Sequence, residues 1–94
     1  MSEKTINSTL EARGSVYGDY GTGVKSRAEI MRVLAEDYAR NNGDVEMPEV
    51  AKGMLWDIVN KLCRLSVTPY HVDSWHDIQG YARLSETIAR GKNT

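Results

Sequence analysis

Two helix-breaking segments divide most of this chain into stretches with helical periodicity. The segment "RNNG", which ends at Gly43, and the nearby Pro48 separate the first stretch from the second, and "SVTPYHVDS", which contains Pro69, separates the second from the third. Proline suits the first turn of a helix and glycine suits its C-terminal end, because proline lacks an N–H group and glycine adopts a positive φ easily. No alternation of period two lasts long enough to predict a strand. The chain is therefore expected to be all-α.

Each stretch carries apolar side chains at helical spacing, the pattern of a helix that buries one face. The first stretch begins at Val24, the second begins near Pro48, and the third runs from about Ser74 to Arg90 or Gly91. The side chains expected to be buried are Val24, Ala28, Ile30, Met31, Val33, Leu34, Ala35 and Tyr38 in the first stretch, Ala51, Met54, Leu55, Ile58, Leu62 and Leu65 in the second, and Ile78, Ala82, Ser85 and Ala89 in the third.

A shorter helix is expected near the N-terminus. The segment "STLEARG" places Ser8 three residues before Glu11, as in a capping box, and Gly14 follows at a typical C-terminal position. Glycines at positions 14, 18, 21 and 23 then predict a loop. The expected fold is a single all-α domain over residues 1–94: a compact bundle of three main helices plus a short N-terminal helix, with a Gly-rich loop before the second helix.

The small size and balanced charge of the chain restrict its partners. A domain of 94 residues buries only about two thirds of its surface or less, so we expect a homo-oligomer. Twelve Lys and Arg residues against thirteen Asp and Glu residues give a net charge of −1, which argues against duplex DNA or an anionic membrane as partner. The absence of a signal-peptide core and of an apolar run of roughly 18 residues, together with the single cysteine, Cys63, predicts a cytoplasmic protein.

The segment "YGDYGTGVKSR", residues 17–27, is the first candidate for a binding site. It resembles the phosphate-binding G-x-x-x-x-G-K-S pattern, but one extra residue precedes the lysine and no hydrophobic strand leads into it, so it is not a Walker loop. A helix that begins near Val24 still presents unpaired N–H groups to an anion. The candidate ligand-binding residues here are Tyr17, Gly18, Tyr20, Lys25 and Arg27. The alternative, a plain linker whose glycines supply positive φ, stays open.

The second candidate is a charged strip on the predicted helix that begins near Pro48. Asp57, Lys61 and Arg64 fall on one side at 100° per residue. A solvated face with an Asp57–Lys61 ion pair explains such a strip without any ligand. However, Trp56 flanks the strip, and Gly53 interrupts the helix at a cost of about 1 kcal/mol. These two residues favour a neighbour or a ligand at this surface, and we include Lys61 and Arg64 among the candidate ligand-binding residues.

The third candidate is the segment "HVDSWHDIQGYA", residues 71–82. Asp73 and Asp77 can share a helix face and hold Mg²⁺, with Asp57 as a third ligand; alternatively, Asp73 or Ser74 caps the helix and the acidic side chains interact with its dipole. The aromatic residues Trp75 and Tyr81 complete the candidate ligand-binding set. The two histidines lack a zinc spacing, so no zinc site is predicted.

The same segments carry a resemblance to a protein family. "RGSVYGDY" (residues 13–20), "KLCR" (61–64) and "DSWHDIQGYA" (73–82) resemble a family of small phage and prophage proteins of unknown function, with the pattern R-G-x-x-Y-G-D, then K-x-x-R, then D-x-W-x-D-I-x-G-Y-A. The family is distantly similar to nucleotide-modification-associated domains and to all-α pyrophosphohydrolases of nucleoside triphosphates. Those enzymes hold Mg²⁺ with an E-x-x-E pair and an E-x-x-D pair, which this chain lacks. The resemblance therefore implies nucleotide binding in the host cytoplasm without a complete metal cluster.

Three functions are compatible with these features. The first is a non-catalytic, cofactor-free phage protein that sequesters a nucleotide or a nucleotide-derived signal, such as a cyclic one, between the subunits of an oligomer as a counter-defence. The second is a Mg²⁺-dependent pyrophosphohydrolase with Asp57, Asp73 and Asp77 as metal ligands. The third is an inhibitor that docks on a host enzyme through an exposed apolar patch. The first function agrees best with the sequence, because the chain has too few paired carboxylates for metal catalysis.

Overall fold

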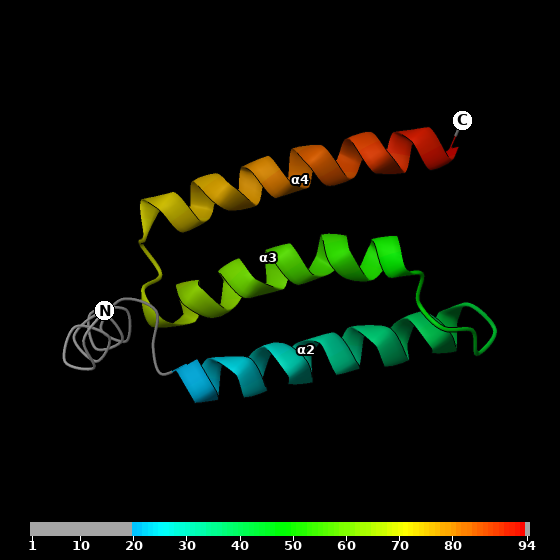
Figure 1. The fold of residues 1–94 in the computed structure, drawn as a ribbon, viewed down its shortest axis with the longest axis horizontal. Helices are drawn as coiled ribbons and strands as arrows, with labels where there is room; N and C mark the ends of the chain where they lie inside the picture. Colours follow the sequence, from blue (N-terminus) through cyan, green and yellow to red (C-terminus); the bar gives the residue numbers. More distant parts are fainter. Residues whose placement is uncertain (1–19, 94) are drawn as a thin grey trace, which may run out of the picture.

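The computed structural model describes residues 20–93, which form three α-helices joined by two short connections. Helix α2 spans Tyr20–Asn41, α3 spans Glu49–Val67 and α4 spans Val72–Asn93. Each helix runs antiparallel to the one before it, and α3 lies between α2 and α4 (Figure 1). The predicted all-α bundle of three main helices is confirmed, and the described residues contain no strand. The predicted N-terminal helix lies outside the described residues.

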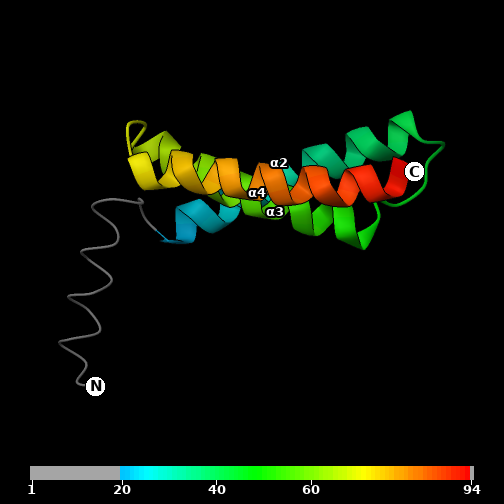
Figure 2. The same ribbon diagram turned by 90° about the horizontal axis from the view of Figure 1, so that it is seen from above.

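Helix α3 organises the bundle because both other helices pack against it. Helices α2 and α4 flank α3 and make few contacts with each other, and Figure 2 shows α2 and α3 crossing at an angle. The buried apolar side chains of the described chain are Met47, Val59 and Leu65. Such an arrangement buries two sides of the middle helix but only one side of each outer helix. The described part of a single copy therefore has a small core.

The small core corrects several predictions of burial. Leu62 on α3 is 46% exposed, although its spacing predicted a core position. On α4, Ile78 and Ser85 are only half-buried, and Ala82 and Ala89 are exposed. Four residues of the predicted α2 stripe are exposed as well: Val24, Ala28, Ile30 and Val33. The predicted apolar stripe of each helix is wider than the surface its neighbours cover, because α2 and α4 stand on separate sides of α3. Apolar side chains consequently remain accessible on all three helices.

Helix α2 begins earlier than predicted, at Tyr20 instead of Val24. Two glycines of the expected loop, Gly21 and Gly23, therefore belong to the helix. The side chain of Arg27 lies back over Gly23, with Nη1 3.4 Å from the position that a Cβ atom would occupy there. The missing side chain at this position gives the guanidinium room. The helix ends as predicted, with Gly43 at a φ of 76° and the amide of Asp44 donating to the carbonyl of Ala39 at 2.7 Å.

Helix α4 begins at Val72, so neither Asp73 nor Ser74 is its cap, contrary to the prediction. Both residues lie in the first turn. Ser74 is buried, and its hydroxyl lies 2.8 Å from Nδ1 of His71, the residue before the helix. The indole N–H of Trp75 donates to the carbonyl of Pro69 at 2.8 Å. These two hydrogen bonds attach the first turn of α4 to the connection from α3 and fix the direction in which α4 leaves it.

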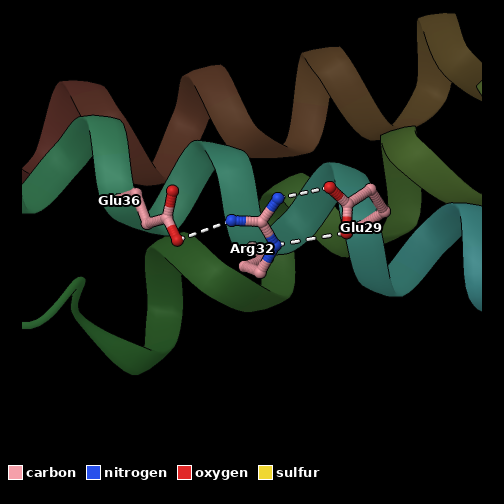
Figure 3. Close-up of polar contacts among 3 residues, drawn as sticks. All are labelled: Glu29, Arg32 and Glu36. Carbon is pink, nitrogen blue, oxygen red and sulfur yellow. Dashed lines mark hydrogen bonds and ion pairs between the residues drawn. The ribbon is translucent and has the colours of Figure 1, made fainter.

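The outward face of α2 carries a network of ion pairs. Arg32 donates to both carboxylate oxygens of Glu29 and, at 2.6 Å, to Glu36 (Figure 3). The guanidinium lowers the pKa of Glu29 because it donates hydrogen bonds to that carboxylate and attracts its negative charge. All three side chains are exposed. This network belongs to the solvated side of the helix.

Candidate ligand-binding site

An ion pair between α3 and α4 lies at the centre of the candidate site. Nζ of Lys61 lies 2.8 Å from Oδ2 of Asp77. The lysine side chain is only 10% exposed, whereas the aspartate side chain is 42% exposed. Lys61 therefore reaches across to α4 instead of pairing along α3 with Asp57, as the solvated-strip alternative required. Asp57 itself is exposed.

The environment of Asp77 favours its ionised form. The hydrogen bond from Lys61 is the largest effect and lowers the pKa of Asp77; partial desolvation opposes it, and the positive charges of Lys61, His76 and Arg64 lower the pKa further. These charges act because His76 and Arg64 lie in the same corner of the bundle as the ion pair. Asp77 is thus a carboxylate whose charge is already balanced by Lys61.

A shallow pocket of about 210 Å³ adjoins this ion pair. It is lined by residues one helical turn apart on α4, so that they share one face: His76, Asp77, Gly80, Tyr81 and Leu84. Gly80 leaves the backbone bare, since a Cβ atom there would meet nothing within 4 Å. The pocket combines an aromatic ring, an imidazole and a neutralised carboxylate. Typical sites for small ligands measure about 300–1,000 Å³, so this pocket accommodates one group of a nucleotide and not the whole molecule.

The predicted residues of α2 form a separate surface. Tyr20 and Lys25 are exposed. The guanidinium of Arg27 lies 5.7 Å from the centre of the Trp56 ring, a cation–π distance, and its Nε is buried without a hydrogen-bond partner. Burial raises the pKa of the nearby Cys63 thiol, and the charge of Arg27 opposes this only in part, as expected of an inert cysteine. Helix α3 lies between this surface and the pocket on α4.

The three predicted segments lie at the same end of the molecule. The start of α2, the end of α3 and the start of α4 all lie there, with α3 between the other two (Figure 1). At this end Asp77 and Tyr81 line the pocket, Lys61 pairs with Asp77, and Arg64 lies close enough to act on Asp77. Trp75 is half-exposed and uses its indole N–H to hold Pro69, which is a structural role. Tyr17 and Gly18 lie outside the described residues.

The metal ligands of the enzyme alternative do not meet. Within residues 20–93, no three side chains of His, Cys, Asp or Glu are grouped so that they could hold a metal ion. Asp57, Asp73 and Asp77 therefore do not form the predicted ligand set, and Asp77 is bound to an ammonium group instead. Spacing along the chain placed these aspartates on suitable faces, but α3 and α4 meet through Lys61.

Several features of the pocket were missing from the predicted site. His76, Gly80 and Leu84 were not selected, and Lys61 was not paired with Asp77. The lining residues do carry a signal, because positions 76, 77, 80, 81 and 84 follow the spacing of a single helix face. Such a signal becomes informative only when it is known that α3 leaves part of this face uncovered.

Comparison with known proteins identifies the chain at the level of a family. The model of a domain of unknown function, DUF6378, matches residues 4–89. No curated protein and no solved structure gives a match to the chain. Among the described helices, none combines the length and the apolar character that crossing a membrane requires.

Proposed function

This chain belongs to the DUF6378 family, and we propose from the geometry of its site that it binds a nucleotide or a nucleotide-derived ligand without hydrolysing it. The pocket at the α3–α4 corner receives the ligand. The base stacks on Tyr81, and the phosphates extend toward His76 and the positive field of Arg64. Base–aromatic stacking contributes about 1–3 kcal/mol, and charge-assisted hydrogen bonds add to it.

The observation that carries the proposal is the ion pair between Lys61 and Asp77. An ionised carboxylate in a pocket wall repels phosphate, but here a lysine at 2.8 Å balances its charge. The same lysine competes with any cation for Asp77. Metal-dependent hydrolysis needs carboxylates that are free to coordinate Mg²⁺, whereas Asp77 is paired with Lys61. Binding without catalysis agrees with this arrangement better than the pyrophosphohydrolase alternative does.

The biological role that we propose is sequestration of a nucleotide-derived signal of the host by a phage-encoded protein. Its support is the resemblance of the three sequence islands to small phage and prophage proteins, which is an argument by analogy. A protein that only captures a signal needs affinity and no turnover, and a small helical domain with one pocket meets that need.

Calorimetry with a panel of ligands tests the proposal. The panel holds mono-, di- and triphosphates of each nucleoside, cyclic mono- and dinucleotides and ADP-ribose derivatives, each with Mg²⁺ and with chelator. We expect heat of binding from at least one member in both conditions, and no product when the mixture is analysed by chromatography. The absence of binding heat from every member of the panel would overturn the proposal. Turnover that the chelator abolishes would instead support the pyrophosphohydrolase alternative.

Two variants and a control connect the signal to the pocket. Tyr81→Ala removes the stacking surface, and His76→Ala removes an exposed imidazole from the lining. Each is expected to weaken binding, with Tyr81→Ala costing about 1–3 kcal/mol of binding free energy. Tyr70→Ala is the matched control, because Tyr70 is an exposed tyrosine in the connection before α4 and does not line the pocket. Equal losses in Tyr70→Ala and Tyr81→Ala would place the ligand elsewhere.

A further inference from the structure

One face of α4 continues the pocket as an uncovered apolar strip. Leu84, which lines the pocket, is 65% exposed, and Ile88 one turn further on is 42% exposed. Gly80, one turn before Leu84, offers open space where a side chain would be. These three residues are spaced by four and therefore lie along one side of the helix. The strip has a bare position at one end and a large apolar side chain at the other.

The charges of α4 are arranged so that the helix complements itself. Its first turn contains the acidic residue Asp73 and its last turn contains Arg90 and Lys92. Asp77 and Arg90 already pair with Lys61 and Glu86 of the same copy, so Asp73 and Lys92 carry the complementarity. When two such helices pair antiparallel, the acidic start of each lies beside the basic end of the other, and their dipoles also oppose favourably. A two-fold axis imposes this reciprocity on every contact, because residue i meets residue j and residue j meets residue i.

The apolar strip fits the same antiparallel pairing. Gly80 and Ile88 are each four residues from Leu84. With the two copies of Leu84 at the axis, Ile88 of one copy lies opposite Gly80 of the other, where the open space can receive it. Two exposed leucines and two exposed isoleucines are removed from water together. Shape and charge thus select the same partner, a second copy of this chain.

We infer that two copies of this chain associate through antiparallel α4 helices with Leu84 at the centre, and that this interface covers the pocket, because Gly80 and Leu84 belong to both. A second copy and a ligand stacked on Tyr81 therefore compete for the same face of α4. The part that concerns the ligand rests on the proposed function; the interface stands by itself.

The mass of the full chain in solution, measured by sedimentation velocity, is the first test. The unsubstituted chain is expected to sediment as a dimer and the Leu84→Asp chain as a monomer with unchanged helical circular dichroism, because Leu84 is mostly in water within one copy. Val72→Asp is the matched control: Val72 is also strongly exposed on α4 but lies away from the strip, so this variant should stay dimeric. A dimer that survives Leu84→Asp would overturn the inference.

Disulfide trapping tests the direction of the helices. In a Cys63→Ala background, Gly80→Cys and Ile88→Cys chains are mixed and oxidised. Disulfides need Cα atoms within about 4.4–6.8 Å of each other, so antiparallel pairing predicts a mixed disulfide that neither chain forms with itself. Self-linked Gly80→Cys and self-linked Ile88→Cys chains would show parallel helices and would overturn the inference.

Calorimetry on the same chains separates the two proposals. The ligand identified for the unsubstituted chain should shift its sedimentation from dimer toward monomer, and its apparent affinity should fall several-fold as the chain concentration is raised. Dimerisation through α4 without binding of any nucleotide would overturn the proposed function and support the interface. A chain that is monomeric in the absence of nucleotide overturns the interface, and a dimer that nucleotide leaves unchanged overturns the competition. If the unsubstituted chain is a monomer and Leu84→Asp lowers its free energy of unfolding in urea, the strip is covered within the chain. This result would also overturn the inference.

Discussion

The ammonium of Lys61 and the carboxylate of Asp77 form an ion pair that is buried at the lysine and partly exposed to solvent at the aspartate. Nζ and Oδ2 are 2.8 Å apart, but the lysine side chain is 10% exposed and the aspartate side chain 42%. Water can therefore solvate Asp77 if Lys61 is removed, whereas it cannot reach Lys61 to the same extent if Asp77 is removed. This asymmetry separates the consequences of two substitutions that break the same contact.

We expect Asp77→Asn to destabilise the chain more than Lys61→Met does. The first substitution leaves a buried ammonium without its charged partner, and an unsatisfied buried group of this kind costs about 1–3 kcal/mol. The second leaves Asp77 without its partner, but this side chain is 42% exposed and water can solvate it, so we expect a loss of about 0–1 kcal/mol, as for an exposed ion pair. Urea unfolding followed by circular dichroism measures both. Asp57→Asn, on the exposed side of α3, is the control and should change little. The reverse order would mean that the pair is solvated at Lys61.

The same ion pair predicts a dependence of stability on acid. The pKa of Asp77 in the folded chain is lowered, first by the hydrogen bond from Lys61. In the pH window between this pKa and the unfolded value of about 3.9, the unfolded chain binds more protons than the folded chain. The contribution is therefore complete above about pH 4 and is lost as the pH falls through the folded pKa.

Asp77→Asn removes this contribution, so the difference in unfolding free energy between Asp77→Asn and the unsubstituted chain should shrink as the pH falls below about 4. Urea unfolding at a series of pH values measures it. Some acid dependence should persist in the variant, since Glu29 and Glu46 also have lowered pKa values, through hydrogen bonds from Arg32 and Lys52 respectively. A difference that stays constant across this window would show that the carboxylate of Asp77 gains nothing from Lys61.

Trp75→Phe tests the attachment of α4 to the connection that precedes it. The substitution keeps an aromatic ring and removes the hydrogen bond from the indole N–H to the carbonyl of Pro69. We expect a loss of about 0.5–1.5 kcal/mol in the free energy of unfolding, the usual net value of one hydrogen bond. Tyr70→Phe is the control, because Tyr70 is almost fully exposed in the same connection. If Trp75 instead stacks on the ligand, Trp75→Phe will weaken nucleotide binding while stability is unchanged.

The number and order of the helices could be predicted from the sequence because their ends are local chemistry. Gly43 and Pro48 act through their own backbones, and α2 and α3 end and begin where these residues require. Positions 21 and 23 are the exceptions, since glycines predicted a loop there and the structure has helix. At position 23 the absent side chain leaves room for Arg27, one turn later in the same helix.

The candidate site could be predicted only in part, because its main contact joins two helices. Spacing placed Lys61 on a strip with Asp57, but it carries no information about which helix packs beside that strip. The order of the helices across the bundle, with α3 in the middle, brings Asp77 to Lys61 instead. The same arrangement leaves Ala82 exposed although it has the spacing of a core residue. Which face is covered is decided by the neighbours of a helix.

Gly53→Ala is expected to stabilise the chain by about 0.4–1 kcal/mol. Gly53 lies inside α3, and a Cβ atom there would meet nothing within 4 Å in the part of the chain that the structure describes, so alanine lowers the entropy of the unfolded chain without a clash. The interruption of α3 by glycine had instead suggested a close neighbour or ligand.

Urea unfolding of three alanine variants tests this reading of Gly53. Gly43→Ala should be destabilised by about 1–2 kcal/mol, because its φ of 76° is costly for any residue with a side chain. Gly80→Ala resembles Gly53→Ala in its open surroundings. It should gain stability as a monomer in the Leu84→Asp background and lose dimer affinity in the unsubstituted chain, since its methyl group occupies the space assigned to Ile88 of the second copy. A Gly53→Ala chain that is destabilised, with Gly43→Ala behaving as expected, would show that another group does approach α3 at this position.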